Sequence, residues 1–252
     1  MNDLIFILPV CIKEYKHKEL WKECVRCIRI FYKEIPIIII IDNCNIALLE
    51  IEENDYPKSN IIFIKSEFNG AGEFLPYYYF YKLKLAKKAI FLQDSMFIKK
   101  PFDEEEINKI ENIKFLWHFI NDKHENYDMQ IELLSNLNYN NELIELYNNE
   151  NLWNGCMGSV CIITLEFLEL LENKYKLFNL ITRINNREKR CCLERLIAII
   201  SFNELKWNKN DIKSYSIYGF INEYMGLPFQ LTFEIYKKIN LNLPLIKCWN
   251  SR

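Results

Sequence analysis

The stretch 89-AIFLQDSMFI-98 is apolar except for three polar residues at its centre, Gln93, Asp94 and Ser95. Burying the carboxylate of Asp94 inside a strand costs free energy unless a cation or hydrogen-bond donors meet it, so such a break is typical of a strand that ends at a ligand site. Upstream, 69-NGAGE-73 places two glycines before an aromatic segment with a helical pattern. The backbone amides of such a loop can face an anion at the start of the helix.

The segments around this stretch alternate between two periodicities. Nearly uninterrupted apolar runs predict buried strands at 4–10, 35–41, 61–64 and 89–98. Between them, apolar residues spaced by three and four predict helices at 18–33 and 72–87. This alternation predicts an α/β fold with a Rossmann-like, mostly parallel sheet and helices on both faces.

The second half of the chain continues the pattern more weakly. The acidic run 103–106 predicts the start of a helix, where carboxylates face the positive end of the dipole. We expect a strand over 114–120, helical pieces over 121–151, a strand near 163 followed by a helix that Thr164 caps, and a helix over 192–202. No linker, repeat or low-complexity tract is visible, which predicts a single domain over 1–252.

Composition indicates a sizeable core and a balanced charge. Half of the 252 residues are apolar, which excludes a disordered chain, and 32 basic and 34 acidic residues give a net charge of −2. This balance lacks the basic excess of a nucleic-acid-binding protein. No signal-peptide pattern opens the chain and no apolar run approaches the roughly 20 residues of a membrane helix, so we expect a cytoplasmic location and no transmembrane segment.

The nine cysteines fit the same expectation. Several lie in apolar runs, where a free thiol behaves as a small hydrophobic group, and buried thiols are typical of a reducing compartment. The pair Cys24 and Cys27 lies in a helical pattern without a second pair at zinc spacing. We therefore expect both in the core rather than in a zinc or redox site.

Two common nucleotide-binding motifs are missing from the sequence. A dinucleotide fold requires Gly-x-Gly-x-x-Gly after the first strand, but the turn here is 10-VCIKE-14 and has no glycine. No Gly-x-x-x-x-Gly-Lys-Ser/Thr motif occurs either, so a P-loop NTPase is not indicated.

Two predicted strands end in an acid, Asp42 and Asp94. Ligands of open α/β sheets bind beyond the carboxyl ends of the strands, so these acids and the loop 70–73 are candidates for one site. Taken alone, Asp42 also fits a plain turn aspartate. The four tyrosines within 77–81 are expected to pack against the sheet, with stacking on a sugar or base as the alternative.

This order of elements resembles the nucleotide-sugar half of GT-A glycosyltransferases of the family-two-like kind. The run 40-IIDNC-44 is similar to the family's Ile-Val-Asp-Asp-x-Ser motif, and 93-QDS-95 stands where the family often has Asp-x-Asp. The resemblance runs from residue 4 to about 202 and implies a single GT-A-like domain, with a nucleotide-binding half at 1–101 and an acceptor-side half at 102–252. It also implies transfer of a hexose from a nucleotide diphosphate sugar to a hydroxyl group of a glycan, a protein or a small molecule.

The resemblance also implies roles for individual residues. Asp42 would contact the base or ribose, and Asp94 would hold either the metal ion, Mn²⁺ or Mg²⁺, or the donor diphosphate itself. The donor would be bound by a set of residues from the first half: Pro9, Asp42, Gly70, Gly72, Glu73, Gln93, Asp94 and Ser95.

In the second half, 153-WNGCMGS-159 resembles the glycine-containing acceptor loop of these enzymes, which implies that Trp153, Asn154 and Gly155 face the acceptor. Glu194 stands where inverting members place a carboxylate base at a helix start. A base there takes the proton of the attacking hydroxyl. A surface salt bridge with Arg190 is the alternative for Glu194. The end of the chain, 247–252, either folds back over the nucleotide or forms a plain tail.

The triplet is the largest departure from the family. Gln93 and Ser95 replace two acids, which leaves one carboxylate, whereas Mg²⁺ and Mn²⁺ prefer several oxygen ligands. One alternative is that a single carboxylate, diphosphate oxygens and waters suffice to hold the metal, and another is a metal-independent enzyme. A non-catalytic descendant of the fold that acts as a binding or scaffold protein is the alternative from a different class. A nucleotidyltransferase is a third possibility, but it would be expected to carry a basic, glycine-rich loop after the first strand.

Overall fold

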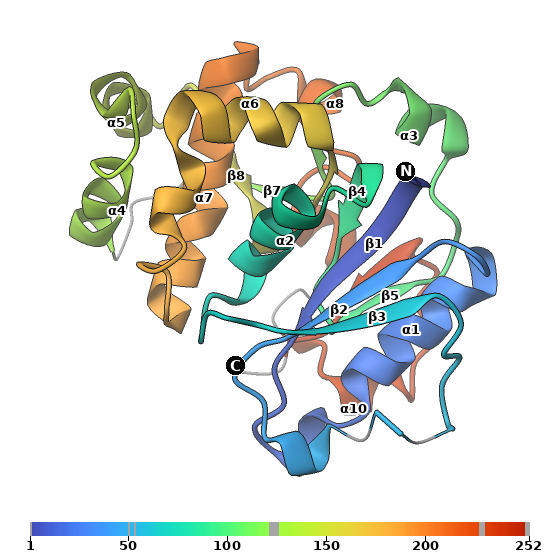
Figure 1. Cartoon of the computed structure of the whole chain (residues 1–252). Helices are drawn as coiled ribbons and strands as arrows, with labels where there is room; N and C mark the ends of the chain where they lie inside the picture. Colours follow the sequence, from blue (N-terminus) through green and yellow to red (C-terminus); the bar gives the residue numbers. More distant parts are fainter. Residues whose placement is uncertain (1, 50, 53, 121–125, 227–229, 250–252) are drawn as a thin grey trace.

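The computed structural model describes residues 2–49, 51–52, 54–120, 126–226 and 230–249, and in them six strands form one sheet in the order β3-β2-β1-β4-β9-β6 (Figure 1). Strands β1 to β4 are parallel to one another, whereas β9 runs antiparallel to both of its neighbours. The predicted α/β fold with a mostly parallel sheet is therefore confirmed. In chain order, the strands are β1 (Asn2–Val10), β2 (Ile37–Ile41), β3 (Ile61–Lys65), β4 (Ala86–Phe91), β6 (Ile113–Phe115) and β9 (Cys161–Thr164).

Side chains of the central strands alternate between two apolar layers. Along β1, Phe6 and Leu8 enter one layer, and Ile5 and Ile7 enter the other. Because successive side chains of a strand point to opposite faces, an uninterrupted apolar run is what a sheet covered on both faces requires. The predicted coverage of both faces is confirmed.

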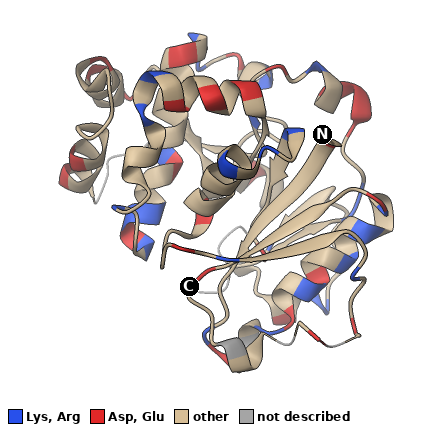
Figure 2. Ribbon diagram, viewed as in Figure 1, with Lys and Arg blue, Asp and Glu red and all other residues tan. Residues whose placement is uncertain are grey.

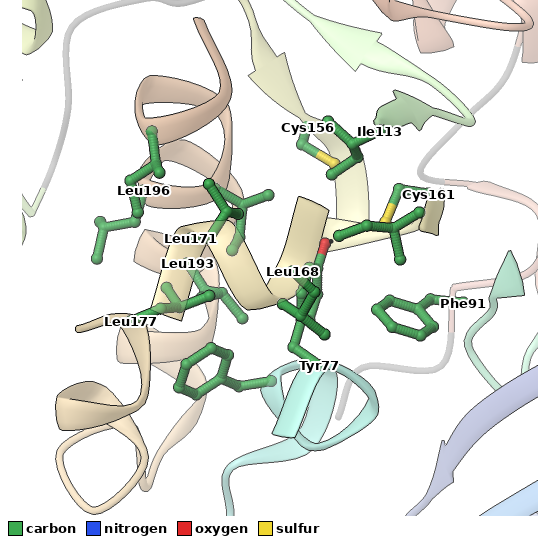
Figure 3. Packing of buried hydrophobic residues seen from close by; sticks show 14 of the residues in the cluster. Tyr77, Phe91, Ile113, Cys156, Cys161, Leu168, Leu171, Leu177, Leu193 and Leu196 are labelled. Atoms are coloured by element: carbon green, nitrogen blue, oxygen red, sulfur yellow. Dashed lines mark hydrogen bonds between the residues drawn. The ribbon is translucent and has the colours of Figure 1, made fainter. Parts of the chain in front are cut away.

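Helices pack on each face. On one face lies α1 (Leu20–Phe31), which buries Trp21, Cys24 and Cys27 against the sheet, so this cysteine pair lies in the core. Figure 3 shows the opposite layer, where leucines of two helices meet Tyr77 and Phe91. The helices of this layer are α2 (Leu75–Leu83), α4 (Tyr127–Leu134), α5 (Asn140–Asn148), α6 (Leu165–Tyr175) and α7 (Arg187–Leu205).

Short elements complete the described chain. Two two-stranded ladders lie outside the main sheet: β5 (Met96–Ile98) with β10 (Leu245–Lys247), and β7 (His118–Phe119) with β8 (Gly155–Cys156). The short helices are α3 (Glu104–Lys109), α8 (Ile212–Tyr215), α9 (Ile221–Met225) and α10 (Phe233–Tyr236). The 3₁₀ turns are η1 (Tyr15–His17), η2 (Ile46–Leu48), η3 (Gly72–Phe74), η4 (Met157–Ser159) and η5 (Leu177–Leu180).

Two predicted helix starts are confirmed by their caps. Asp103 accepts hydrogen bonds from the backbone N–H groups of Glu105 and Glu106 at 2.9 and 3.2 Å and so begins α3. The hydroxyl of Thr164 accepts from Phe167 N at 3.2 Å and begins α6. Each cap satisfies backbone donors that have no partner inside the helix.

Four predicted elements differ from the structure. The helix expected over 192–202 begins at Arg187, where the Asn186 side chain caps it, so Glu194 lies seven residues inside the helix and not at its start. The run 89–98 is two strands, because β4 ends before the polar triplet and β5 leaves the sheet to pair with β10. The helix expected to reach residue 87 ends at Leu83, since Lys84 adopts the left-handed conformation (φ 49°) from which the chain turns into β4. The strand expected over 114–120 is split into β6 and β7, which pair with different partners.

Charged residues lie mainly on the helices and loops, and the strands of the main sheet carry few of them (Figure 2). Among the described residues, no helix is both long and apolar enough to cross a membrane.

The tyrosines of α2 pack as expected, and one of them holds the turn before β9. Tyr77 and Tyr79 are buried, and Tyr77 Oη donates to the carbonyl of Ser159 at 2.8 Å. Ser159 has a positive φ of 53°, a conformation that costs free energy for a residue with a side chain. The buried hydrogen bond from α2 therefore helps to fix η4, which the site described below uses.

Replacing Tyr77 with Phe leaves the Ser159 carbonyl without its buried donor. We expect the free energy of unfolding to fall by about 1–3 kcal/mol, measured by urea denaturation followed by circular dichroism. Tyr81→Phe on the same helix is the matched control and should change it by no more than about 0.5 kcal/mol. Equal effects of the two variants would show that the Tyr77 hydroxyl does not hold the turn.

Candidate functional site

A cleft of about 1070 Å³ lies at the carboxyl ends of β1, β2 and β4. This is the edge of an open α/β sheet at which ligands bind. The far wall of the cleft is the first part of α7, and the segment 247–249 closes another side. Nine predicted site residues from both halves of the sequence line it: Pro9, Asp42, Gly70, Gly72, Glu73, Gln93, Asp94, Ser95 and Glu194.

Asp42 is held by the glycine loop. Its two carboxylate oxygens accept hydrogen bonds from Gly70 N at 2.7 Å and Gly72 N at 2.8 Å. Burial raises the pKa of this carboxyl group, and the two backbone hydrogen bonds offset part of the rise. Asp42 is thus more than a turn aspartate, because it fixes a loop that is distant in sequence.

A chain of polar contacts crosses the cleft from the glycine loop to the end of the chain. Arg190 pairs with Glu73 at 2.9 Å and also donates to the carbonyl of Gly70 at 3.1 Å. Glu73 accepts from Gln93 Nε2 at 2.9 Å, and Gln93 Oε1 in turn accepts a hydrogen bond from Lys247 Nζ. The alternative of a Glu194–Arg190 salt bridge is not what the structure has, because Arg190 pairs with Glu73.

The polar triplet offers a divalent cation few ligands. Asp94 is 5% exposed and is the one carboxylate of the three. Both ends of the Gln93 amide are engaged, by Glu73 and by Lys247. Within the described ranges, no three His, Cys, Asp or Glu side chains lie close enough together to hold a metal. Since Mg²⁺ and Mn²⁺ take several oxygen ligands, these residues do not fit the predicted Mn²⁺ or Mg²⁺ site.

Among the carboxyl groups of the cleft, that of Glu194 has the most strongly shifted pKa. Its Oε1 accepts a hydrogen bond from Gly158 N at 3.0 Å, in the η4 turn. Burial raises its pKa to about 7, the Arg195 cation opposes the rise, and the Glu73 carboxylate adds to it. A carboxyl group that titrates near neutral pH in a cleft is suited to accept or donate a proton during a reaction.

The predicted acceptor residues lie behind the cleft wall. Trp153 is fully buried and stacks on Tyr147 at 5.7 Å, and the Asn154 side chain donates to Tyr215 Oη. A Cβ atom on Gly155 would come within 2.0 Å of the Phe119 ring. Gly155 therefore leaves room for Phe119, and it is Phe119 that lines the cleft.

Several residues that the sequence did not single out line the same cleft. The guanidinium of Arg195 lies over the Phe119 ring at 4.8 Å from its centre. Gln130 of α4 is 2% exposed, and its Oε1 atom has no hydrogen-bond partner among the described residues. The segment 247–252 was expected either to fold back over the nucleotide or to form a plain tail. Residues 247–249, among them Lys247, line the cleft, and 250–252 lie outside the described residues.

Glu194 makes a testable contribution to stability. The pKa of this carboxyl group is near 4.5 in the unfolded chain and about 7 in the folded protein. Between pH 4.5 and 7, the folded state therefore binds a proton that the unfolded state has released. Stability must therefore fall as pH rises through this window. Relative to Glu194→Gln, we expect the parent to lose on the order of 1–3 kcal/mol of unfolding free energy between pH 4.5 and 8.

Urea denaturation at a series of pH values measures this difference. Glu188→Gln, which removes an exposed carboxylate from the same helix, is the control and should follow the parent at every pH. A difference between Glu194→Gln and the parent that does not change with pH would contradict the raised pKa.

Comparison with known proteins finds only distant similarity. No protein-family model matches the sequence, and no curated protein does. Among solved structures, the chain is similar to the galactosyltransferase LgtC in complex with donor and acceptor sugar analogs, with 11% identity and a TM-score of 0.45 over 99% of this chain and 87% of that one.

Two further structures extend the comparison. Core-mannan synthase A from Aspergillus fumigatus, in a form with Mn and GDP, shares 12% identity with a TM-score of 0.47 over 81% of this chain and 70% of that one. A structure of S. aureus TarS shares 14% identity with a TM-score of 0.42, and the match covers 75% of this chain and 53% of that one. At these identities and TM-scores the similarities carry no argument about this chain, so its reaction has to be inferred from its own site.

Proposed function

We propose that the chain is a glycosyltransferase that moves a sugar from a nucleotide diphosphate sugar to a hydroxyl acceptor. The observation that carries this proposal is a carboxyl group with a pKa near 7, Glu194, in a cleft at the carboxyl ends of parallel strands. The same cleft brings together the residues that the GT-A resemblance assigns to the donor. The cytoplasmic location remains a prediction from the use of cysteine.

In the proposed reaction, Glu194 is the catalytic base. The acceptor oxygen forms a bond to the anomeric carbon, and the bond from that carbon to the diphosphate oxygen breaks with its electron pair. Glu194 takes the hydroxyl proton, and the nucleoside diphosphate leaves with one more negative charge. A direct displacement of this kind inverts the anomeric carbon. Protonation of Glu194 below its pKa would stop the reaction.

The donor would lie along the strand ends. In the proposed arrangement, Pro9 and the loop around Gly70 and Gly72 border the nucleoside, with Asp42 acting through the loop that it holds. The diphosphate would then lie beside Gln93 and Asp94, between the nucleoside end and Glu194. The cleft volume of about 1070 Å³ has room for a donor and part of an acceptor.

The acceptor would lie at the other end, beside Phe119, Met157 and Gln130. Gln130 supports this placement because a buried amide oxygen without a partner costs folding free energy. A hydroxyl group of a sugar acceptor would donate the missing hydrogen bond. The predicted role of Trp153 and Asn154 in acceptor binding is then indirect, since both are buried beneath this wall.

A non-catalytic binding protein with the same fold is the second candidate. It is favoured by the triplet, in which Gln93 is already bonded to Glu73 and Lys247 and only Asp94 is acidic. Such a protein would bind a nucleotide sugar without turnover. The release of nucleoside diphosphate therefore separates the two candidates.

Donor binding is the first experiment. UDP-glucose, UDP-galactose and GDP-mannose would be titrated by calorimetry and by thermal shift, each with EDTA and with Mn²⁺. A ligand at 100 times its dissociation constant stabilises the folded state by about 2.7 kcal/mol, a readily measured shift. Failure of a broad panel of nucleotide sugars to bind under either condition would contradict the proposal.

Glu194→Gln should separate binding from chemistry. We expect it to lower kcat by about 10²- to 10⁴-fold, because a general base is lost while the shape of the side chain is kept. Donor affinity should stay within about twofold of the parent, a difference of less than 0.5 kcal/mol. In the parent, kcat should rise with pH to a plateau above about 7. A variant with parental kcat would exclude Glu194 as the base.

Gln130→Met tests the acceptor end. We expect the apparent KM for mono- and disaccharide acceptors to rise about tenfold, as the loss of one buried hydrogen bond implies. Stability should stay equal or increase, because an unsatisfied polar group is removed. Glu132→Met, an exposed position on the same helix, should change neither quantity. An unchanged acceptor KM in Gln130→Met would move the acceptor away from α4.

A further inference from the structure

Lys247 is held beside the polar triplet by main-chain pairing. Strand β10 runs antiparallel to β5 with Lys247 opposite Met96, and Cys248 N donates to the carbonyl of Ser95 at 2.9 Å. The residue is 6% exposed and lines the cleft. The backbone thus fixes this lysine next to the residues at which the GT-A resemblance places a metal ion.

The contacts of the ammonium group orient it. Lys247 Nζ donates to Gln93 Oε1 and lies 5.2 Å from the centre of the Trp249 ring. Gln93 is itself oriented by its hydrogen bond to Glu73, which Arg190 holds. Lys247 is also near enough to Glu194 for its positive charge to lower the pKa of that carboxyl group.

A positive side chain in this position competes with a divalent cation. An ion bound by Gln93 and Asp94 would have to displace the ammonium from the amide oxygen and then bear its repulsion at close range. Of the three triplet residues, only Asp94 has a carboxylate with which to bind the ion. An ammonium, by contrast, binds phosphate oxygens as a compact point charge and needs no ligand shell.

We infer that Lys247 takes the part of the divalent ion, so that this chain binds and uses its nucleotide sugar without a metal. The inference rests on the proposed function and corrects the cofactor that the resemblance implies. As the anomeric bond to the diphosphate breaks, negative charge develops on the departing phosphate oxygen. A pre-oriented ammonium beside that oxygen stabilises the charge, as a metal ion would.

The test is the binding of the nucleoside diphosphates UDP and GDP and of their sugars by calorimetry, in EDTA and in Mn²⁺. We expect dissociation constants within about twofold of each other in the two buffers. Lys247→Met should weaken binding about ten- to one-hundredfold in EDTA, the loss of one charged hydrogen bond, and Lys247→Arg should restore most of it.

Lys99→Met is the matched control. Lys99 lies beyond the other end of the β5–β10 ladder and also places its ammonium over an aromatic ring, that of Tyr236, but it does not line the cleft. This variant should bind UDP and GDP as the parent does. Thermal unfolding of each variant identifies any that fail to fold. If Lys247→Met does not fold, nucleotide binding is compared between Lys247→Arg and the parent.

The possible outcomes differ in what they overturn. Binding that appears only with Mn²⁺, or binding by folded Lys247→Met equal to that of the parent, would overturn the role of Lys247 and leave the proposed function intact. Lack of binding of any nucleotide or nucleotide sugar in both buffers would overturn the proposed function, and this inference with it.

Discussion

The carboxylate of Asp42 accepts hydrogen bonds from two backbone N–H groups of the glycine loop, and the end of the cleft at which we propose that the donor binds depends on that pair of hydrogen bonds. They hold Gly70 and Gly72 at positive φ angles of 79° and 45°. A Cβ atom on Gly72 would lie 2.4 Å from the Arg190 side chain, so only glycine lets that arginine pack on the loop. Arg190 then orients Glu73, through which the contacts reach Gln93. One buried carboxylate thus sets the shape of a surface built from four distant segments.

Much of the fold could be predicted from apolar periodicity, because the central strands β1 and β2 and the second half of β4 are buried on both faces and read as nearly uninterrupted apolar runs. The error at 89–98 has a physical origin. Residues 96–98 are as apolar as β4, but their partner is β10, a strand far away in the sequence at 245–247. Periodicity reports burial and does not report which strand a segment pairs with. The early end of α2 depends on the backbone conformation of Lys84, a residue type that gives no helix-stop signal.

The residues of the site likewise divide into those that could be predicted from sequence and those that depend on the packing of distant segments. Asp42, Asp94 and the glycine loop could be found from sequence because they follow apolar strands, at the carboxyl ends where ligands of open α/β sheets bind. All of them line the cleft. Gln130 and Arg195 could not, because the direction of each side chain is set by how α4 and α7 pack on the sheet. Composition likewise gave no sign that the Trp153 loop faces inward. For Lys247 the sequence left two alternatives, a segment that folds back over the nucleotide and a plain tail, since its position follows from the pairing of 245–247 with 96–98.

The proposed donor recognition, proton transfer and charge neutralisation all take place in one cleft, so the position of a bound nucleotide tests them together. The most direct measurement is a crystal structure of Glu194→Gln with the nucleotide sugar that binds most tightly. We predict that the nucleoside lies at the glycine loop that Asp42 holds, that the diphosphate lies beside Gln93 and Lys247, and that the anomeric carbon faces residue 194. A nucleotide bound outside this cleft, or bound with its sugar pointing away from residue 194, would contradict the account.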